Sequence, residues 1–401
     1  MDLYIDRSTA RGPIIAPPSK SMAHRHIICA ALAKGKSTIG NVDLSQDIAA
    51  TLDCIRALGA RAEAKDGIVT VEGIGHFPEG TLDFRCRESG STMRFFMAIA
   101  MLTGRPSRFY GSPTLLNRPF GVYADICRGQ DISFEKREDH IFVEGRLKPG
   151  EYRLPGDVSS QFITGLLFAL PFLDGDSKIE LIPPVESGSY IDLTVSALRE
   201  AGVIVERISP TGLAIRGGQS CAPVDLTVEG DYSNAAFLDA FNAIGGSVEV
   251  GGLSDDSLQG DRVYKGFFGE LKEGRPTIDI SDCPDLGPVL FAVAAANNGG
   301  YFTGTRRLKI KESNRGLVMC EELARFGIET DAGENFIDIK GGGLRKPEDT
   351  VYGHNDHRIV MSMALLLSLT GGKLFGAEAV SKSYPGFFED IMSLGIAVRR
   401  L

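Results

Sequence analysis

Apolar helix patterns recur along the chain at an almost constant interval, and this repeat limits the folds that the sequence can adopt. Each pattern has apolar residues at helical spacing, ends near a glycine and is followed by a strand pattern. Successive starts lie roughly 70 residues apart, with one clearly shorter interval before the fifth start. This first series of helices is predicted to begin at Lys20, Ser91, Ser159, Ser233, Asp285 and Asp356.

A second series of predicted helices has the same period. Its starts recur at the same interval as those of the first series, and the short interval falls at the corresponding place. Amphipathic helices that resemble one another by chance would not produce two series that share both a period and a short unit, so the pattern indicates an internal repeat. The second series is predicted to begin at Asp47, Arg118, Tyr190, Arg262, Glu312 and Lys382.

Six repeated βαβ-like units favour an α/β protein of two domains with three units each, because 401 residues exceed the usual size of one hydrophobic core. The fourth unit is predicted to lack a strand hairpin, since its second helix leads almost directly to the strand at Thr277–Ile280. The N-terminal strand at Leu3–Ile5 has no helix of its own and is expected to complete the second domain's sheet. The expected domains are residues 15–227, and residues 1–14 together with 228–401.

Composition excludes several classes of function. A formal net charge of −9 argues against nucleic-acid binding, so an anion site must be a local cluster of cations. The seven cysteines are scattered singly, which predicts buried thiols in a reducing compartment and no metal site. No signal-peptide pattern or membrane-length apolar run is present, so we expect a cytoplasmic protein without a membrane partner. Nothing in the sequence demands an oligomer, and a monomer is expected.

The stretch from Ala16 to Arg25 predicts an anion site at a helix start. Two prolines prevent a helix before Ser19, and Ser19 or Ser21 can cap one. The first turn would present free N–H groups, hydroxyls and the cations Lys20 and Arg25 to one place. An ordinary capped helix with solvated cations explains this stretch alone equally well.

Polar residues recur at the other predicted helix starts, and this recurrence favours function over simple capping. Gly90 would let a ligand approach the backbone closely, and Ser159 opens a Ser-Ser-Gln run of hydroxyl and amide donors. Taken singly, each is more typical of a helix cap, and a lone His354 or His357 is more typical of a structural hydrogen bond than of a metal ligand. If equivalent helices point the same way, their N-termini converge on a positive interdomain cleft. The sequence has no phosphate-binding P-loop, zinc motif or nucleophile elbow.

Together these motifs resemble the enolpyruvyl transferases, and within them the 5-enolpyruvylshikimate-3-phosphate synthase family. They span nearly the whole chain in the family's order. The matching segments are Pro18–Arg25, Ser89–Arg94, Asn117–Pro119, Val158–Phe162, Tyr190–Asp192, Cys283–Asp285, Lys311–Arg315, Asn355–Arg358 and Lys382–Pro385.

The resemblance implies two domains, each of three βαβαββ units, around an interdomain cleft that binds shikimate 3-phosphate and phosphoenolpyruvate. It implies a step of the shikimate pathway toward chorismate and the aromatic amino acids. The residues implied to bind shikimate 3-phosphate are Lys20, Ser21, Arg25, Ser159, Ser160, Gln161, Ser187, Asp285 and Lys311. Those implied to bind phosphoenolpyruvate are Lys20, Gly90, Arg118, Gln161, Arg315, Arg358 and Lys382.

The implied reaction is addition of the 5-hydroxyl of shikimate 3-phosphate to C2 of phosphoenolpyruvate, followed by elimination of phosphate. General acid–base groups are needed on both sides of the new bond. We assign Asp285 as the base for the hydroxyl, and Glu312 and Lys20 to the proton transfers at C3 and at the departing phosphate. The resemblance implies no metal and no organic cofactor.

Three residues depart from the family pattern. Glu88 stands where many members have Asn, so it must be paired, with Arg94 or Arg118 as candidate partners, to avoid repelling an anion. Phe95 replaces a common proline, and Arg307 stands where an Asn contacting the substrate phosphate is expected. These departures leave sensitivity to the inhibitor glyphosate open.

Two other functions compete with this interpretation. The sister enzyme that acts on UDP-N-acetylglucosamine usually carries a reactive cysteine in the loop before the Arg-Pro pair, but the loop at Gly111–Arg118 has no thiol. A non-catalytic anion sensor on the same scaffold would be supported by the loss of Lys20, Asp285 or Glu312, and all three are present.

Overall fold

The computed structural model describes all 401 residues, which divide into two compact units. The inserted unit is Pro18–Glu229, and the discontinuous unit is Met1–Pro17 with Gly230–Leu401. The boundary expected after residue 14 lies inside strand β2 (Arg11–Ile15) and is wrong by three residues. The reason is that β2 pairs in parallel with β15 (Ser247–Gly251), which keeps the chain in the discontinuous unit as far as Pro17.

The inserted unit contains three four-stranded sheets with one hydrogen-bonding pattern. Their strand orders are β14-β3-β5-β4, β6-β7-β9-β8 and β10-β11-β13-β12. In each sheet the first pair is parallel and the other two pairs are antiparallel. The strands are β3 (Lys36–Gly40), β4 (Arg61–Lys65), β5 (Ile68–Glu72), β6 (Leu82–Arg85), β7 (Ser107–Tyr110), β8 (Ser133–Lys136), β9 (His140–Glu144), β10 (Glu151–Pro155), β11 (Ser177–Ile182), β12 (Val205–Arg207), β13 (Gly212–Ile215) and β14 (Asp225–Thr227).

The discontinuous unit repeats this pattern twice and shortens it once. The sheets β16-β17-β19-β18 and β20-β21-β1-β22 have the same order of parallel and antiparallel pairs, whereas the third sheet has only β15 and β2. The hairpin predicted to be missing from the fourth unit is therefore absent, as expected. The other strands are β1 (Asp2–Ile5), β16 (Thr277–Asp279), β17 (Gly299–Thr303), β18 (Thr330–Ala332), β19 (Phe336–Lys340), β20 (Val351–Tyr352), β21 (Gly372–Phe375) and β22 (Val398–Arg400).

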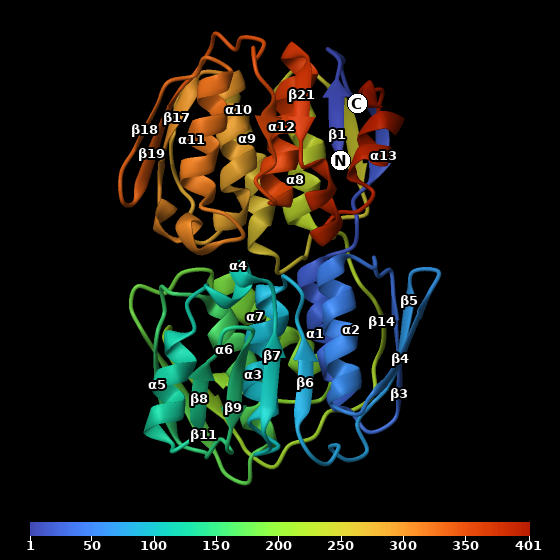
Figure 1. Cartoon of the computed structure of the whole chain (residues 1–401), viewed down its shortest axis with the longest axis vertical. Helices are drawn as coiled ribbons and strands as arrows, with labels where there is room; N and C mark the ends of the chain where they lie inside the picture. Colours follow the sequence, from blue (N-terminus) through green and yellow to red (C-terminus); the bar gives the residue numbers. More distant parts are fainter. The chain divides into compact units, whose positions relative to one another are not determined.

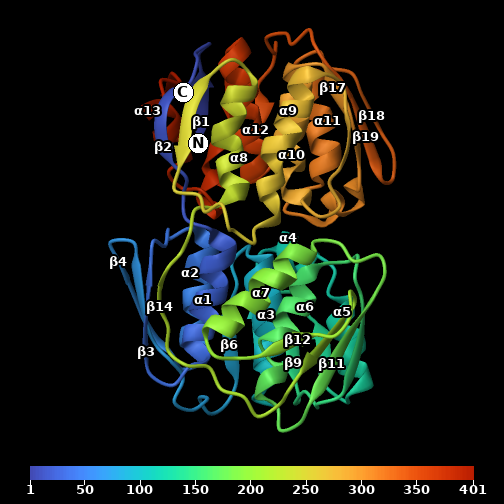
Figure 2. The ribbon, with the colours of Figure 1, turned by 180° about the vertical axis from the view of Figure 1, so that it is seen from behind.

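Helices gather in the middle of each unit, and the sheets lie around them (Figures 1 and 2). In the inserted unit the helices are α1 (Lys20–Leu32), α2 (Gln46–Ala57), α3 (Gly90–Ala100), α4 (Pro113–Leu116), α5 (Gly121–Gly129), α6 (Ser160–Leu167), the 3-10 turn η1 (Leu170–Phe172) and α7 (Gly188–Glu200). In the discontinuous unit they are α8 (Tyr232–Ala243), α9 (Tyr264–Glu273), α10 (Gly287–Ala296), α11 (Arg315–Arg325), α12 (His357–Thr370) and α13 (Phe387–Ser393), with 3-10 turns η2 (Gly260–Val263), η3 (Pro284–Leu286), η4 (Thr305–Ile310) and η5 (Ala377–Lys382).

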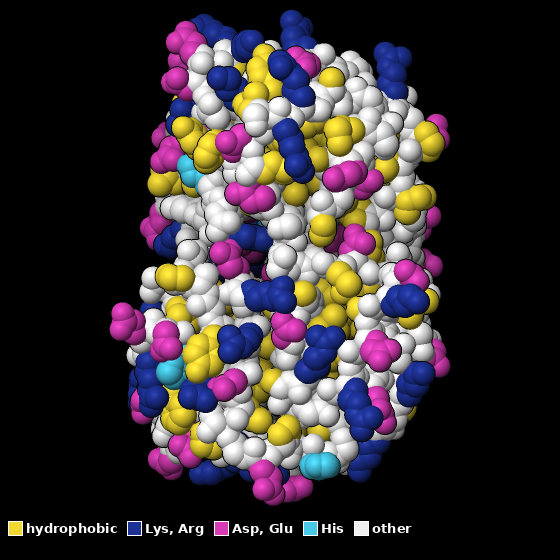
Figure 3. Space-filling view, turned by 45° about the vertical axis from the view of Figure 1, so that its right-hand side comes forward, with side chains coloured by type: hydrophobic (Ala, Val, Ile, Leu, Met, Phe, Trp, Pro, Cys, Tyr) yellow, Lys and Arg dark blue, Asp and Glu magenta, His cyan; other side chains and the backbone are white.

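The central helices are buried because they are apolar on nearly every side. Helix α10 contains no charged residue and nine of its ten residues are buried, as expected for a helix that is hydrophobic all round. Each unit has its own hydrophobic core, and neither core takes a residue from the other unit. No helix combines the length and the apolar character that crossing a membrane requires. On the face shown in Figure 3, Lys and Arg side chains alternate with Asp and Glu.

Most predicted helix starts lie within two residues of the start of an observed α-helix, and three do not. Arg118 lies between α4 and α5, Glu312 lies three residues before α11, and Lys382 ends η5. Proline explains two of these errors, because Pro119 follows Arg118 and Pro385 precedes α13, and a proline disfavours the helical conformation of the residue before it. At the third, Asn314 caps α11 by accepting a hydrogen bond from the N–H of Leu317.

Candidate active site

The discontinuous unit brings together three carboxylates and three cations from four separate segments. Asp285 comes from η3, Lys311 and Glu312 follow η4, Arg315 opens α11, and Asp356 and Arg358 lie at the start of α12. We call these six residues the Asp285 cluster. All six were singled out in the sequence, but Asp356 was named only as a helix start and as part of the motif Asn355–Arg358, without a role in the site.

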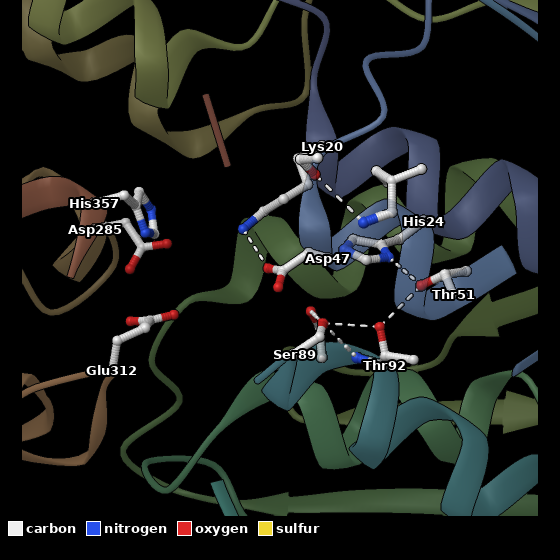
Figure 4. Close-up of polar contacts among 12 residues, drawn as sticks. Lys20, His24, Asp47, Thr51, Ser89, Thr92, Asp285, Glu312 and His357 are labelled. Atoms are coloured by element: carbon white, nitrogen blue, oxygen red, sulfur yellow. Dashed lines mark hydrogen bonds and ion pairs between the residues drawn. The ribbon is translucent and has the colours of Figure 1, made fainter. Parts of the chain in front are cut away.

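Arg315 is the centre of the Asp285 cluster. Only 1% of its side chain is exposed, and its guanidinium donates from Nη1 to Asp285 Oδ1 at 2.9 Å and from Nη2 to Glu312 Oε2 at 2.6 Å. It also donates from Nε to Asp356 Oδ2 at 2.8 Å. Figure 4 shows the carboxylates of Asp285 and Glu312 turned toward each other, with His357 beside Asp285. One arginine therefore fixes all three carboxylates of the cluster.

Asp285 is held in its charged form. Burial alone would raise the pKa of this carboxyl group, but the cations Lys311, Arg358 and Arg315 outweigh burial and hold the pKa well below its usual value. Lys311 Nζ lies 2.9 Å from Asp285 Oδ1, and Arg358 Nη2 lies 3.4 Å from Oδ2. An anionic ligand that engaged these cations would weaken their hold on Asp285 and make it a stronger base.

Lys382 lies at the end of η5 and donates to the backbone carbonyl of Asn355 at 2.5 Å. Asn355 immediately precedes Asp356, which caps α12 by accepting from the N–H of Arg358 at 3.0 Å. The position of Lys382 thus depends on the loop that leads into α12.

In the inserted unit, Lys20 opens α1 and pairs with Asp47 of α2 at 2.8 Å (Figure 4). Ser19 occupies the N-cap position but makes no side-chain capping bond, so the predicted cap is wrong for Ser19. Its own N–H donates to the carbonyl of Glu229 at 2.8 Å. Ser21 follows Lys20 in the first turn of α1, where its carbonyl accepts from Arg25.

Gly90 opens α3 at a place where a side chain would displace an arginine. A Cβ at this position would lie 2.5 Å from Arg118 Nη1 and 3.2 Å from Arg94 Nη1. The missing side chain lets two guanidinium groups reach the N-terminus of α3, which carries free N–H groups. The sequence predicted that a ligand could approach the backbone at Gly90; in the structure the side chains of Arg118 and Arg94 lie in that space.

Arg94 connects α3 to the start of α6. It donates from Nη1 to Gln161 Oε1 at 2.5 Å, and its guanidinium lies over the rings of Phe120 and Phe162 at 5.3 and 5.1 Å. Two other predicted site residues share this helix start. Ser159 caps α6 by accepting from the N–H of Gln161, and Ser160 is buried as the first residue of the helix.

Arg25 is buried between α1 and α7. It donates to the hydroxyl of Thr194 at 2.9 Å and to the carbonyls of Ser21 and Tyr190 at 2.6 and 2.9 Å. Burial lowers the pKa of Arg25 to about 10. Ser187, at the N-cap position of α7, has a left-handed backbone with φ 57° and is 1% exposed.

A chain of side-chain hydrogen bonds links α1, α2 and α3 next to Lys20 (Figure 4). His24 Nδ1 lies 2.7 Å from the hydroxyl of Thr51, which lies 2.9 Å from the hydroxyl of Thr92. Thr92 in turn donates to Ser89 at 2.8 Å. These bonds hold the first turns of α1 and α3 against α2.

Sequence reasoning missed the acidic partners of the predicted cations. Asp47, Asp356 and the cation Arg94 were not assigned to the site, although all three are buried and bonded to residues that were. Arg94 and Asp356 both stand inside motifs that the sequence analysis recognised, which was a usable signal. The pairing of Asp356 with Arg315 was not predictable, because 41 residues separate them and no spacing rule connects them.

A family model described as EPSP synthase (3-phosphoshikimate 1-carboxyvinyltransferase) matches residues 6–391. The chain belongs to the EPSP synthase family. A 3-phosphoshikimate 1-carboxyvinyltransferase of Clostridium kluyveri is 40% identical over 412 residues, which cover 98% of this chain and 96% of the relative. A 3-phosphoshikimate 1-carboxyvinyltransferase of Clostridioides difficile is 37% identical, and the match covers 98% of this chain and 97% of that relative.

Two solved structures share the fold. An EPSP synthase from Acinetobacter baumannii has a TM-score of 0.80 at 24% identity and covers 99% of each chain. The enolpyruvyl transferase NikO from Streptomyces tendae has a TM-score of 0.78 at 15% identity and covers 99% of this chain and 98% of its own. The repeated sheets of this EPSP synthase family member therefore form the two-domain enolpyruvyl transferase fold that the sequence predicted.

Proposed function

We propose that the chain transfers the enolpyruvyl group of phosphoenolpyruvate to the 5-hydroxyl of shikimate 3-phosphate and releases phosphate. Membership of the EPSP synthase family supports the substrates. The observation that carries the chemistry is the Asp285 cluster, where a charged carboxylate contacts Lys311, Arg315 and Arg358. Such a carboxylate can accept a proton while its neighbours bind anions.

The binding roles that we propose follow the family motifs. The two substrates together carry roughly six negative charges, which require many cations in a protein of net charge −9. For shikimate 3-phosphate we propose Lys20, Ser21, Arg25, Ser159, Ser160, Gln161, Ser187, Asp285 and Lys311. For phosphoenolpyruvate we propose Lys20, Gly90, Arg118, Gln161, Arg315, Arg358 and Lys382.

The proposed reaction begins with proton transfer from the 5-hydroxyl to Asp285 as the hydroxyl oxygen attacks C2 of phosphoenolpyruvate. In the free protein the pKa of Asp285 is too low for an effective base, because three cations stabilise its charge. Substrate anions that bind Lys311, Arg315 and Arg358 would draw these cations away and raise the pKa of Asp285. We assign Glu312 and Lys20 to the proton transfers at C3 and at the departing phosphate.

Phosphate release tests this function directly. Purified protein mixed with both substrates should release one phosphate for each enolpyruvyl product, and neither substrate alone should yield phosphate. UDP-N-acetylglucosamine in place of shikimate 3-phosphate should give no product. If calorimetry shows that both substrates bind while no phosphate appears, the chain is a sensor and the proposal fails.

We further propose that the enzyme acts as a cytoplasmic monomer. Seven free cysteines, six of them buried, suit a reducing compartment. Light scattering during gel filtration should give a mass near 43.1 kDa, and twice that mass would refute the monomer.

A further inference from the structure

Glu322 is a buried carboxylate that the proposed reaction does not use. It lies two turns after Arg315 on the buried face of α11, among Val318, Met319 and Leu323. Its side chain is 0% exposed. The apolar pattern of this face calls for an aliphatic residue there, and a buried charge is retained only when it is paired.

The partners of Glu322 come mainly from the segment before α12, where β20 ends at Tyr352 and a short loop follows. Oε2 accepts from the N–H of Tyr352 at 3.0 Å, and Oε1 lies 2.8 Å from His354 Nε2. Arg325, in the same helix, forms an ion pair with Oε2 at 3.1 Å and stacks on the ring of Tyr352 at 5.2 Å. Glu322 therefore holds the loop at two points, one in the backbone and one in a side chain.

The loop that Glu322 holds has an unusual backbone. His354 and Asn355 are consecutive non-glycine residues with φ of 49° and 53°, in the left-handed region that side chains disfavour. Asparagine and histidine adopt this conformation more often than most other side chains do, but as single residues rather than in succession. Such a pair persists only where its surroundings enforce it, and the contact from His354 to Glu322 supplies that restraint.

Two proposed phosphoenolpyruvate-binding residues depend on this loop. The carbonyl of Asn355 accepts from Lys382 at 2.5 Å. The next residue, Asp356, accepts from Arg315 Nε at 2.8 Å. The segment is thus bound to α11 at two places, by Glu322 at Tyr352 and His354 and by Arg315 at Asp356.

We propose that Glu322 is a positioning residue for phosphoenolpyruvate binding. By holding Tyr352 and His354, it fixes the left-handed backbone of His354 and Asn355. That backbone in turn places the Asn355 carbonyl for Lys382 and the Asp356 carboxylate for Arg315. This inference rests on the proposed function for the identity of the ligand. Glu322 touches no reacting atom and acts through the loop alone.

Four variants test the inference: Glu322→Gln, His354→Ala, His354→Gly and, as a matched control, Glu321→Gln, which changes the exposed neighbour on α11. Initial rates of phosphate release are measured against each substrate. Glu322→Gln and His354→Ala should raise the KM for phosphoenolpyruvate about tenfold, because small displacements of binding groups cost up to 10²-fold. The KM for shikimate 3-phosphate should change by less than about twofold, and Glu321→Gln should match the wild type.

The comparison of His354→Gly with His354→Ala separates positioning from a general structural role. Both lose the contact to Glu322, but glycine adopts a positive φ without strain, so the glycine variant should recover much of the phosphoenolpyruvate affinity. Equal defects in the two variants, an equal rise of both KM values, or wild-type KM values in Glu322→Gln would each overturn the inference. The His354 side chain is 28% exposed, so its replacement should not prevent folding. If Glu322→Gln does not fold, the comparison of His354→Ala with His354→Gly therefore tests the inference by itself.

A crystal structure of Glu322→Gln keeps this inference separate from the proposed function. If the wild type released no phosphate, the proposed function would fail, yet the structure would still report on the loop. A negative φ at His354 or Asn355, with the Asn355 carbonyl turned away from Lys382, supports the inference. An unchanged loop refutes it.

Discussion

Gly90 shows how the absence of a single side chain makes room for arginine side chains in the proposed phosphoenolpyruvate site. Its missing Cβ leaves room for Arg118 Nη1, which would otherwise stand 2.5 Å away. We expect Gly90→Ala to push the Arg118 guanidinium aside and to raise the KM for phosphoenolpyruvate about tenfold or more, with less effect on the KM for shikimate 3-phosphate. Steady-state kinetics of phosphate release with each substrate varied in turn measures the difference.

The matched control for this prediction is Gly121→Ala, because a Cβ at Gly121 meets nothing within 4 Å. Arg118→Ala should reproduce the selective defect without filling any space. If Gly90→Ala weakened both substrates equally, the interpretation based on Arg118 would be wrong.

Asp356 is the residue on which the arrangement of the Asp285 cluster depends most. It is fully buried, caps α12 and receives hydrogen bonds from Arg315 Nε and Nη2 at 2.8 and 3.2 Å. Asp356→Asn keeps the cap but removes the charge opposite a buried guanidinium, which should destabilise the protein by about 3 kcal/mol. Denaturant unfolding measures this loss. The exposed Asp349→Asn is the control and should change stability by less than about 0.5 kcal/mol.

The sequence identifies the cations of the site more readily than their partners. Lys311, Arg315 and Arg358 stand in short motifs with recognisable spacing. Asp47 and Asp356 are recognised only after folding, because each meets its cation from a distant part of the chain. In the sequence an isolated acidic residue is indistinguishable from a solvated one, and most surface ion pairs contribute little.

At the scale of one element, α1 carries two buried histidines that the proposed reaction does not use. Burial lowers the pKa of His26 to about 4 and, with the cations Lys20 and Arg25, lowers that of His24 well below its usual value. The unfolded chain binds protons near pH 6.5, so the folded state loses stability as pH falls from 6.5 toward 4, where it holds fewer protons.

For His26 alone the loss between pH 7 and pH 5 should be about 2 kcal/mol. Urea unfolding at the two pH values measures it. His26→Gln should reduce this difference by about that amount, because glutamine does not titrate. The exposed His76 is the control, and His76→Gln should leave the pH dependence unchanged. An identical pH dependence in wild type and His26→Gln would contradict the prediction.

Helices were predictable as elements because their apolar residues recur at helical spacing and glycines end them. Predicted starts fail at Arg118, Glu312 and Lys382, where prolines or a capping Asn delay the helix. The strand hairpins were harder to assign, since β4 and β18 contain no buried residue and their strand conformation depends on pairing with the rest of the sheet.

For the whole molecule, the repeat predicted the number and kind of structural units. The domain boundaries depend instead on which unit the first two strands of the chain pair with. Strand β1 lies between β21 and β22, and β2 pairs with β15, so the segment Met1–Pro17 belongs with Gly230–Leu401. The sequence predicted the place of β1, because that strand has no helix of its own, but it did not predict that β2 pairs with β15. These pairings follow from the edges that each sheet leaves open for another strand.

This chain path makes the inserted unit a candidate for independent folding. Its core takes every residue from within Pro18–Glu229. Its two ends are joined, since the N–H of Ser19 donates to the carbonyl of Glu229 at 2.8 Å and β14 pairs with β3. We therefore expect the fragment 18–229 to fold with one cooperative urea transition and helical circular dichroism.

The complementary fragment 230–401 should not fold, because it lacks β1 and β2 and leaves β21 and β22 without the strand between them. Adding a synthetic peptide of residues 1–17 should restore part of its structure by supplying that strand. A shorter fragment, 18–223, lacks β14 and should be less stable than 18–229, since β3 then loses its parallel neighbour. If 230–401 folded as stably as 18–229, β1 would not have the structural role that its central position in the sheet indicates.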